Sequence, residues 1–171
     1  MRRFAAMILV LCFVLCGCGN SFEKGQQLLQ DGQYAEAKVY FQKLIDEEKE
    51  LPFAYYGMGI SCVELKEYED AAVFLEKALA HKTENTAETY SMLGACNIEL
   101  KWYEEALEFY QKALEDQNLT EGLKQEIEYN LIAVYEYLGE WEKAEQQLNH
   151  YVENYPTDER LDKEEIFLET R

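Results

Sequence analysis

The sequence of 171 residues is poor in basic residues, in histidine and in proline. It has 16 lysines and arginines against 34 aspartates and glutamates, which gives a formal net charge of −18. A nucleic-acid surface needs a basic stripe that contacts phosphates, so this charge excludes ordinary nucleic-acid binding. The same charge opposes unaided adsorption to an anionic membrane.

The chain also lacks the residue clusters that build a metal or catalytic centre. Its only two histidines, His81 and His150, are far apart in sequence, and no acidic or Cys/His cluster has metal-ligand spacing. Ser91 has no histidine or lysine beside it, and no glycine-rich phosphate loop is present. We therefore expect no enzyme, no bound metal and no other cofactor.

No hydrophobic run is long enough to form a membrane-spanning helix. The longest, residues 4–16, falls short of the roughly 20 residues that a span requires. It follows Arg2 and Arg3, and a short basic region before a short apolar run is typical of a signal peptide. We therefore expect residues 1–17 to be a signal peptide.

The residues at the end of this run are Leu15-Cys16-Gly17-Cys18, which resemble a bacterial lipobox. The resemblance implies cleavage before Cys18 and attachment of a diacylglyceryl group to its sulfur, which would anchor the protein to a membrane. The host envelope would be the outer face of a monoderm membrane or a diderm outer membrane. The alternatives are plain secretion and an uncleaved anchor.

Cys62 and Cys96 lie inside helical patterns beside apolar residues. We expect both to be small buried residues, because packed helix axes are usually too far apart for a disulfide. The alternative is a disulfide or a reactive pair.

After residue 20 the chain repeats itself with steps of 34, 35 and 38 residues. Three columns recur: Gly25, Gly59 and Gly94; Tyr34, Tyr68, Tyr103 and Trp141; Ala37, Ala71, Ala106 and Ala144. The small residues would let two helices approach closely, and the aromatic residue would fill the bend between them. No unit can bury its apolar face alone, so neighbouring units must stack.

This pattern resembles the tetratricopeptide repeat, a helix–turn–helix unit of 34 residues. The resemblance implies an all-α, right-handed solenoid. Its parts would be a degenerate unit over 18–51, units over 52–86, 87–124 and 125–158, and a C-terminal capping helix over 159–171. Two departures are Lys24, where a large apolar residue is expected, and Ile132, which stands in the small-residue position.

The 3.6-residue periodicity and the helix breakers predict the helix boundaries. The predicted helices are 21–31, 34–48, 52–65, 68–81, 86–100, 103–116, 120–138 and 141–154. The tail after Asp158, with Leu161, Ile166 and Leu168 apolar among charges, predicts a ninth helix that covers 141–154.

In this architecture the first helices of the units form a concave face, which is the usual place for partner binding. The predicted groove residues are Phe53, Tyr56, Ile60, Val63, Ser91, Ala95, Ile98, Tyr129, Ala133 and Tyr137. The groove is apolar and aromatic, and Glu64, Glu99 and Glu136 edge it. It has no lysine, arginine or histidine, so a clamp for a partner's C-terminal carboxylate is not expected. The alternative is that the tyrosines pack against the next unit.

Trp102 stands where the preceding unit has Glu67, so we expect its ring to be at least half exposed. It would be a contact residue or lie over Lys101 or the next turn.

The function that these features favour is a membrane-anchored adaptor that binds an apolar, basic partner segment in the groove. An alternative is an assembly factor or chaperone that transiently holds exported proteins. The pattern predicts no oligomeric state.

Overall fold

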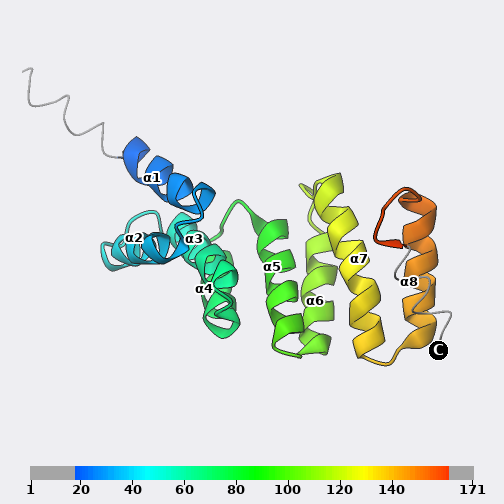
Figure 1. The fold of residues 1–171 in the computed structure, drawn as a ribbon. Helices are drawn as coiled ribbons and strands as arrows, with labels where there is room; N and C mark the ends of the chain where they lie inside the picture. The colour runs from blue at the N-terminus through cyan, green and yellow to red at the C-terminus, as the bar shows by residue number, and fades with distance from the viewer. Residues whose placement is uncertain (1–17, 162–171) are drawn as a thin grey trace, which may run out of the picture. The chain divides into compact units, whose positions relative to one another are not determined.

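A computed structural model of the protein describes residues 18–161, with side chains from residue 21. Within this range the chain forms eight α-helices and no strand (Figure 1). The helices are α1 Cys18–Gln30, α2 Tyr34–Asp46, α3 Leu51–Glu64, α4 Tyr68–Ala80, α5 Thr86–Glu99, α6 Tyr103–Leu114, α7 Glu121–Tyr137 and α8 Trp141–Asn154. The chain divides into two compact units, Met1–His81 and Lys82–Arg171.

All eight helices predicted between residues 21 and 154 are confirmed, with boundaries shifted by at most three residues. The largest shift is at α1, which begins at Cys18 rather than at residue 21. Helix α2 ends at Asp46, two residues before the predicted end, because Glu48 has a positive φ of 52°. The ninth helix predicted for the tail lies almost wholly outside the described residues.

Each first helix ends in the same way. The residue just before the next N-cap has a positive φ: Gly32, Lys66, Lys101 and Gly139, at 69°, 60°, 63° and 71°. In each case the following amide N–H donates to a carbonyl five residues back, as Trp102 does to Asn97 at 2.8 Å. This is the Schellman arrangement, which satisfies the last carbonyls of a helix and turns the chain sharply.

In the first unit, α2 packs against α3 and α3 packs against α4. Small side chains allow the close approach: Ala37 and Ala71 are fully buried, and a Cβ atom on Gly59 would stand 2.5 Å from Leu75 Cδ2. Phe41 and Leu75 fill the space between the helices and are fully buried. A large side chain from a second helix thus packs against glycines of the first helices: Phe41 against Gly25 and Gly57, and Leu75 against Gly59.

In the second unit, α5, α6, α7 and α8 form a row of antiparallel helices (Figure 1). One core cluster joins α6 and α7 and includes Tyr110, Ile127 and Val134, each fully buried. A second cluster joins α7, α8 and the segment after α8, with Ile132, Leu148, Tyr151 and Leu161 as its buried members. Ile132 occupies the position where the other units have glycine, and its larger side chain is a buried member of this second cluster.

The segment after α8 folds back onto the last helix pair. Leu161 is 7% exposed and contacts the cluster of Ile132, Leu148 and Tyr151. This placement agrees with the predicted covering of residues 141–154 as far as the described chain extends. Between residues 18 and 161, no helix is both long and apolar enough to cross a bilayer.

Candidate interaction surfaces

The predicted groove residues of the first unit lie on one stripe of α3. Phe53, Tyr56, Ile60 and Val63 are all half-buried, whereas the residues between them are mostly fully buried. The helix carries no charged residue until Glu64, its last position. Before Glu64, the part of α3 that solvent can reach is therefore apolar and aromatic.

Phe53 differs from the other three because it is held inside an aromatic cluster. Its ring centroid lies 4.6 Å from that of Phe22 and 5.3 Å from that of Phe41. Phe22 belongs to α1, so Phe53 joins α1 to α3. It offers less free surface than the stripe prediction assumes, because α1 packs against α3 at this point.

In the second unit the stripe is broken at Ser91. Ser91 is only 6% exposed, because α5 packs against both α6 and α7. The prediction that Ser91 lines the groove therefore needs correction: the residue is enclosed. Further along α5, Ala95 is exposed and Ile98 is half-buried against the α6–α7 cluster.

On α7, Tyr129 is half-buried and its ring is covered by the chain's own C-terminal segment. The guanidinium carbon of Arg160 lies 4.1 Å from the Tyr129 ring centroid. Arg160 also donates from Nη2 to the Tyr151 hydroxyl at 2.7 Å and to Asp158 Oδ2 at 2.6 Å. Ala133 is half-buried one turn away. The groove surface of the last unit is therefore partly taken up by residues 158–160.

Tyr137 lies at the last position of α7 and is 57% exposed. Its ring stacks on that of Tyr103, the first residue of α6, with 4.7 Å between centroids and 18° between planes. Next to Tyr103 stands Trp102, which is 51% exposed. The predicted exposure of Trp102 is thus confirmed, and its side chain lies beside an aromatic pair that the sequence analysis did not predict.

The aromatic column at the inter-helix turns lies at the surface of its helix pairs. Tyr34, Tyr68 and Tyr103 are half-buried, and Trp141 is 41% exposed. The alanine column is fully buried throughout: Ala37, Ala71, Ala106 and Ala144. Gly25 and Gly94 meet Phe41 and Tyr110 in the same way that Gly59 meets Leu75.

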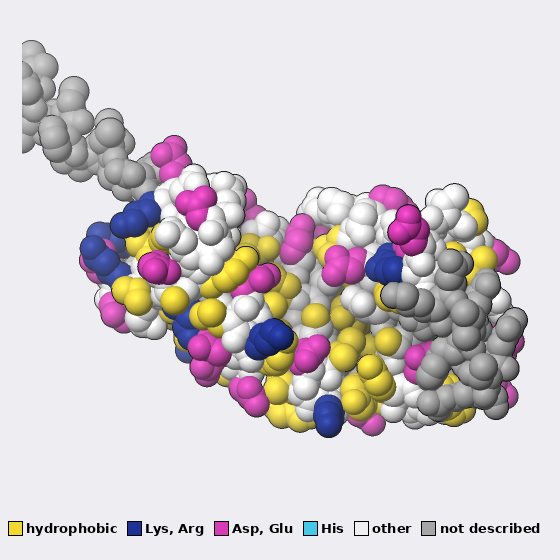
Figure 2. Space-filling model, in the orientation of Figure 1, with side chains coloured by type: hydrophobic (Ala, Val, Ile, Leu, Met, Phe, Trp, Pro, Cys, Tyr) yellow, Lys and Arg dark blue, Asp and Glu magenta, His cyan; other side chains and the backbone are white. Residues whose placement is uncertain are grey.

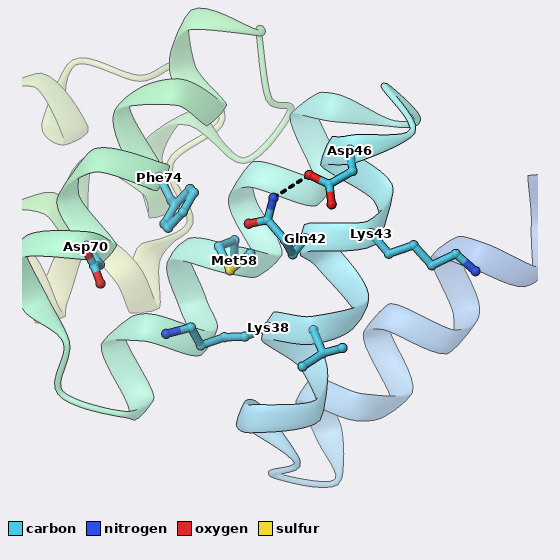
Figure 3. Close-up of a pocket in the computed structure, with 8 residues that line it drawn as sticks. Lys38, Gln42, Lys43, Asp46, Met58, Asp70 and Phe74 are labelled. Carbon is cyan, nitrogen blue, oxygen red and sulfur yellow. Dashed lines mark hydrogen bonds between the residues drawn. The ribbon is translucent and has the colours of Figure 1, made fainter.

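A cleft of about 600 Å³ opens in the first unit between α2 and α4. Met58 of α3 and Phe74 of α4 form its apolar part, and Lys38 points toward α4 across it (Figure 3). Lys38 forms an ion pair with Glu67, and Gln42 donates to Asp46 at 2.8 Å. Sequence reasoning missed this cleft, although Val39 beside it, an apolar residue on an otherwise polar stripe, is 74% exposed.

The described residues contain no group of three or more His, Cys, Asp or Glu side chains placed to hold a metal ion. Cys62 and Cys96 are buried free thiols, as expected, and burial raises the pKa of Cys62 to about 11. The Asn97 amide donates to the Leu93 carbonyl of its own helix at 2.7 Å, so it does not reach toward a partner carboxylate. Acidic side chains are spread over both units, with apolar patches between them (Figure 2).

Sequence profiles of the tetratricopeptide repeat match residues 50–119 and, in a second form, residues 19–49 and 127–158. No curated protein is significantly similar in sequence. Among solved structures, residues 41 to the end of MamA from Desulfovibrio magneticus RS-1 align with a TM-score of 0.72 and 21% identity, covering 86% of this chain and 83% of that one.

Two further structures are similar. MamA AMB-1 aligns with a TM-score of 0.71 and 17% identity, covering 87% of this chain and 79% of that one. YrrB, described as a TPR protein with an unusual peptide-binding site, aligns with a TM-score of 0.69 and 25% identity, covering 80% of this chain and 68% of that one.

Proposed function

The chain belongs to the tetratricopeptide repeat family, and we propose that it is a membrane-anchored adaptor of the bacterial cell envelope. Tetratricopeptide repeats serve as protein–protein interaction scaffolds and are generally not enzymes. In this proposal, the apolar stripe of the first helix α3 binds an apolar segment of a partner protein that also carries basic residues. The similarity to YrrB supports a peptide or protein segment as the ligand.

The accessible surface of α3 carries this proposal. Tyr56, Ile60 and Val63 are reached by solvent on a helix without a charge before Glu64, in a chain with 34 acidic residues. A contiguous apolar stripe in so acidic a protein marks a surface that a partner covers. Half-buried aromatic side chains are also the usual energetic centres of protein interfaces.

The charge around the stripe favours a basic partner. Glu64 ends α3 and is exposed, and the chain carries a net charge of −18. A negative field speeds encounter with a basic segment and disfavours an acidic one. Binding should therefore weaken as the salt concentration rises.

The lipobox-like residues before Cys18 support the anchoring part of the proposal. Helix α1 begins at Cys18, so an acyl anchor on this residue would have no linker between it and the first repeat. The repeats would then lie at the membrane surface, where a membrane-associated partner can reach them. Two or three acyl chains suffice for lasting attachment.

The groove is tested by replacing Tyr56 and Ile60 with serine in the tagged, full-length protein. In-cell crosslinking with mass spectrometry should show a dominant partner that this double variant loses. The matched control is Val73→Ser, which removes an apolar side chain that is 48% exposed on a second helix, α4. If the wild type, the double variant and Val73→Ser all crosslinked to the partner equally, the groove would not be the binding site. A broad set of weak crosslinks would instead favour a chaperone.

The anchor is tested separately with Cys18→Ser. This variant should lose membrane association or keep its signal sequence, as read by fractionation and intact mass. The control, Cys16→Ser, should be processed and retained like the wild type. A Cys18→Ser protein that is still processed and membrane-bound would refute the lipid anchor and leave the groove proposal standing.

A further inference from the structure

The second unit carries exposed aromatic rings at the edge where its first helices turn into its second helices. Trp102, Tyr137 and Trp141 are 51%, 57% and 41% exposed. Trp102 is joined to Tyr137 through Tyr103, which follows it in the chain and stacks on Tyr137 at 4.7 Å. Trp141 begins α8 just after the turn that follows Tyr137. We call these four residues the aromatic edge.

The other repeats show that folding does not require aromatic side chains at two of these positions. The N-cap position held by Trp102 is Gln33, Glu67 and Glu140 in the other three helix pairs. The last position of the first helix, held by Tyr137, is Gln30, Glu64 and Glu99. Because polar residues suffice there, the fold of the repeat does not require these two rings.

The two versions of the edge make different contacts with the same geometry. In the first unit, burial and the nearby carboxylate of Glu64, at the end of α3, raise the pKa of Tyr34, the first residue of α2. In the second unit, Tyr103 and Tyr137 occupy the matching positions and stack ring on ring. The second unit thus has a stacked pair of tyrosines where the first has a tyrosine beside a carboxylate, and Tyr137 of that pair is 57% exposed.

The charges around this surface select its ligand. Residues 99–105 and 136–143 contain six glutamates and two lysines, and Lys143 is already bound to Glu140 at 2.6 Å. An aromatic face flanked by carboxylates attracts arginine, whose guanidinium stacks on the ring while its N–H groups reach the carboxylates. An anionic lipid surface is disfavoured by the same charges.

We propose that the aromatic edge is a second protein-binding surface, separate from the groove on the first helices, and that it takes an arginine-bearing segment of a partner. The stacked pair Tyr103–Tyr137 holds one ring face in place, and Trp102 offers the other. The proposal does not depend on the groove or on the lipid anchor.

The probe for the test is a labelled, helix-forming peptide of arginine, leucine and alanine, with a twin that has glutamate in place of every arginine. Both tryptophans of the chain lie on this edge, so tryptophan emission reports it directly. In a Trp141→Phe background, the arginine peptide should change the emission of Trp102, and the glutamate twin should not. Equal responses to both peptides would overturn the proposal.

The binding surface is then tested with a double variant, Trp102→Glu with Tyr137→Glu. Glutamate is compatible with the fold at both positions, because the first unit has Glu67 and Glu64 there. Peptide affinity measured by anisotropy should fall by about tenfold or more, although the variant is more negative and should attract the peptide better. Tyr137→Phe, which keeps the ring, should bind like the wild type.

The matched control is Val73→Glu, which adds a glutamate at an exposed apolar site whose counterpart in the next repeat is Glu108. It should keep full affinity, and so should the groove variant Tyr56→Ser with Ile60→Ser. If Val73→Glu lost as much peptide affinity as the double variant, or if only the groove variant lost affinity, the aromatic edge would not be the binding surface. A change in emission on adding phosphatidylcholine vesicles would indicate a lipid surface, and a change on concentrating the protein alone would indicate a second copy of the chain. Either result would also reject the proposed arginine-binding surface.

Discussion

The ring of Tyr110 lies directly against the backbone of Gly94: a Cβ atom at position 94 would stand 2.7 Å from ring atom Cε1. Tyr110 is fully buried, so its ring has no open space to enter. The same relation links Gly59 with Leu75. The recurring glycines of the first helices are therefore explained by close approach of a large side chain from the second helix.

Replacing Gly94 with alanine should destabilise the second unit. Overpacking a filled core usually costs about 1–3 kcal/mol, which exceeds the gain of about 1 kcal/mol in helix propensity. The free energy of unfolding in urea measures the difference. Gly122→Ala is the control, because a Cβ there meets nothing within 4 Å and should stabilise α7 slightly. A Gly94→Ala protein as stable as the control would show that Tyr110 can move aside.

Replacing Lys101 with glycine should stabilise the protein. Lys101 has a φ of 63°, in the turn position that is glycine at residues 32 and 139. Relief of the left-handed strain, about 1–2 kcal/mol, outweighs the greater flexibility of glycine in the unfolded chain, leaving a gain of about 0.5–1 kcal/mol. Thermal unfolding of Lys101→Gly and Lys101→Ala checks this, since alanine keeps the strain. Equal melting temperatures for the two variants would contradict it.

Asp158 should stabilise the end of the second unit in a pH-dependent way. Hydrogen bonds from Arg160 and from the Tyr151 hydroxyl hold the pKa of Asp158 well below its usual range. Because the pKa in the folded state lies below the unfolded value of about 3.9, the stabilisation is present above that pH and is lost as the pH falls further. Asp158→Asn should cost about 1–3 kcal/mol at neutral pH.

The measurement for Asp158 is the free energy of unfolding of both proteins over a range of pH. The difference between wild type and Asp158→Asn should shrink on acidification. A difference that stays constant, or grows toward low pH, would show that the carboxylate does not act through its charge.

Cys62 should be unreactive in the folded protein. Its side chain is fully buried, and burial raises its pKa to about 11, so the thiol keeps its proton near neutral pH. A folded pKa above the unfolded one also means that this group contributes stability that is lost as the pH rises above about 8.5. Iodoacetamide labelling read by peptide mass spectrometry should mark Cys62 only after urea is added. Rapid labelling of Cys62 without denaturant would contradict the buried placement.

The helices could be predicted closely because their signals are local. The 3.6-residue periodicity and the breakers Gly32, Pro52 and Gly139 place the helix ends within three residues. Turns at Lys66 and Lys101 carry no glycine, yet the repeat spacing places them as well, because their aligned counterparts are Gly32 and Gly139. The exposure of Trp102 also followed from comparison with Glu67 in the sister repeat.

The groove was harder to predict because accessibility depends on neighbours in space. The sequence places Phe53, Ser91 and Tyr129 on the same predicted stripe of the first helices. In the structure, α1 covers Phe53, packing of α5 against α6 and α7 encloses Ser91, and Arg160 stacks on Tyr129. Helical spacing predicts which residues share one face of a helix. It does not predict which other segment of the chain will pack on that face.

By itself, the sequence determined the all-α repeat, its helix pairs and the residues that allow close packing, since these depend on spacing within about forty residues. The tertiary structure decided the rest. It stacked Tyr103 on Tyr137, folded residues 155–161 back over Tyr151, and opened the cleft between α2 and α4. Each of these joins side chains from different helices or turns, and the free energy of such contacts depends on how completely the neighbouring atoms fill the space between them.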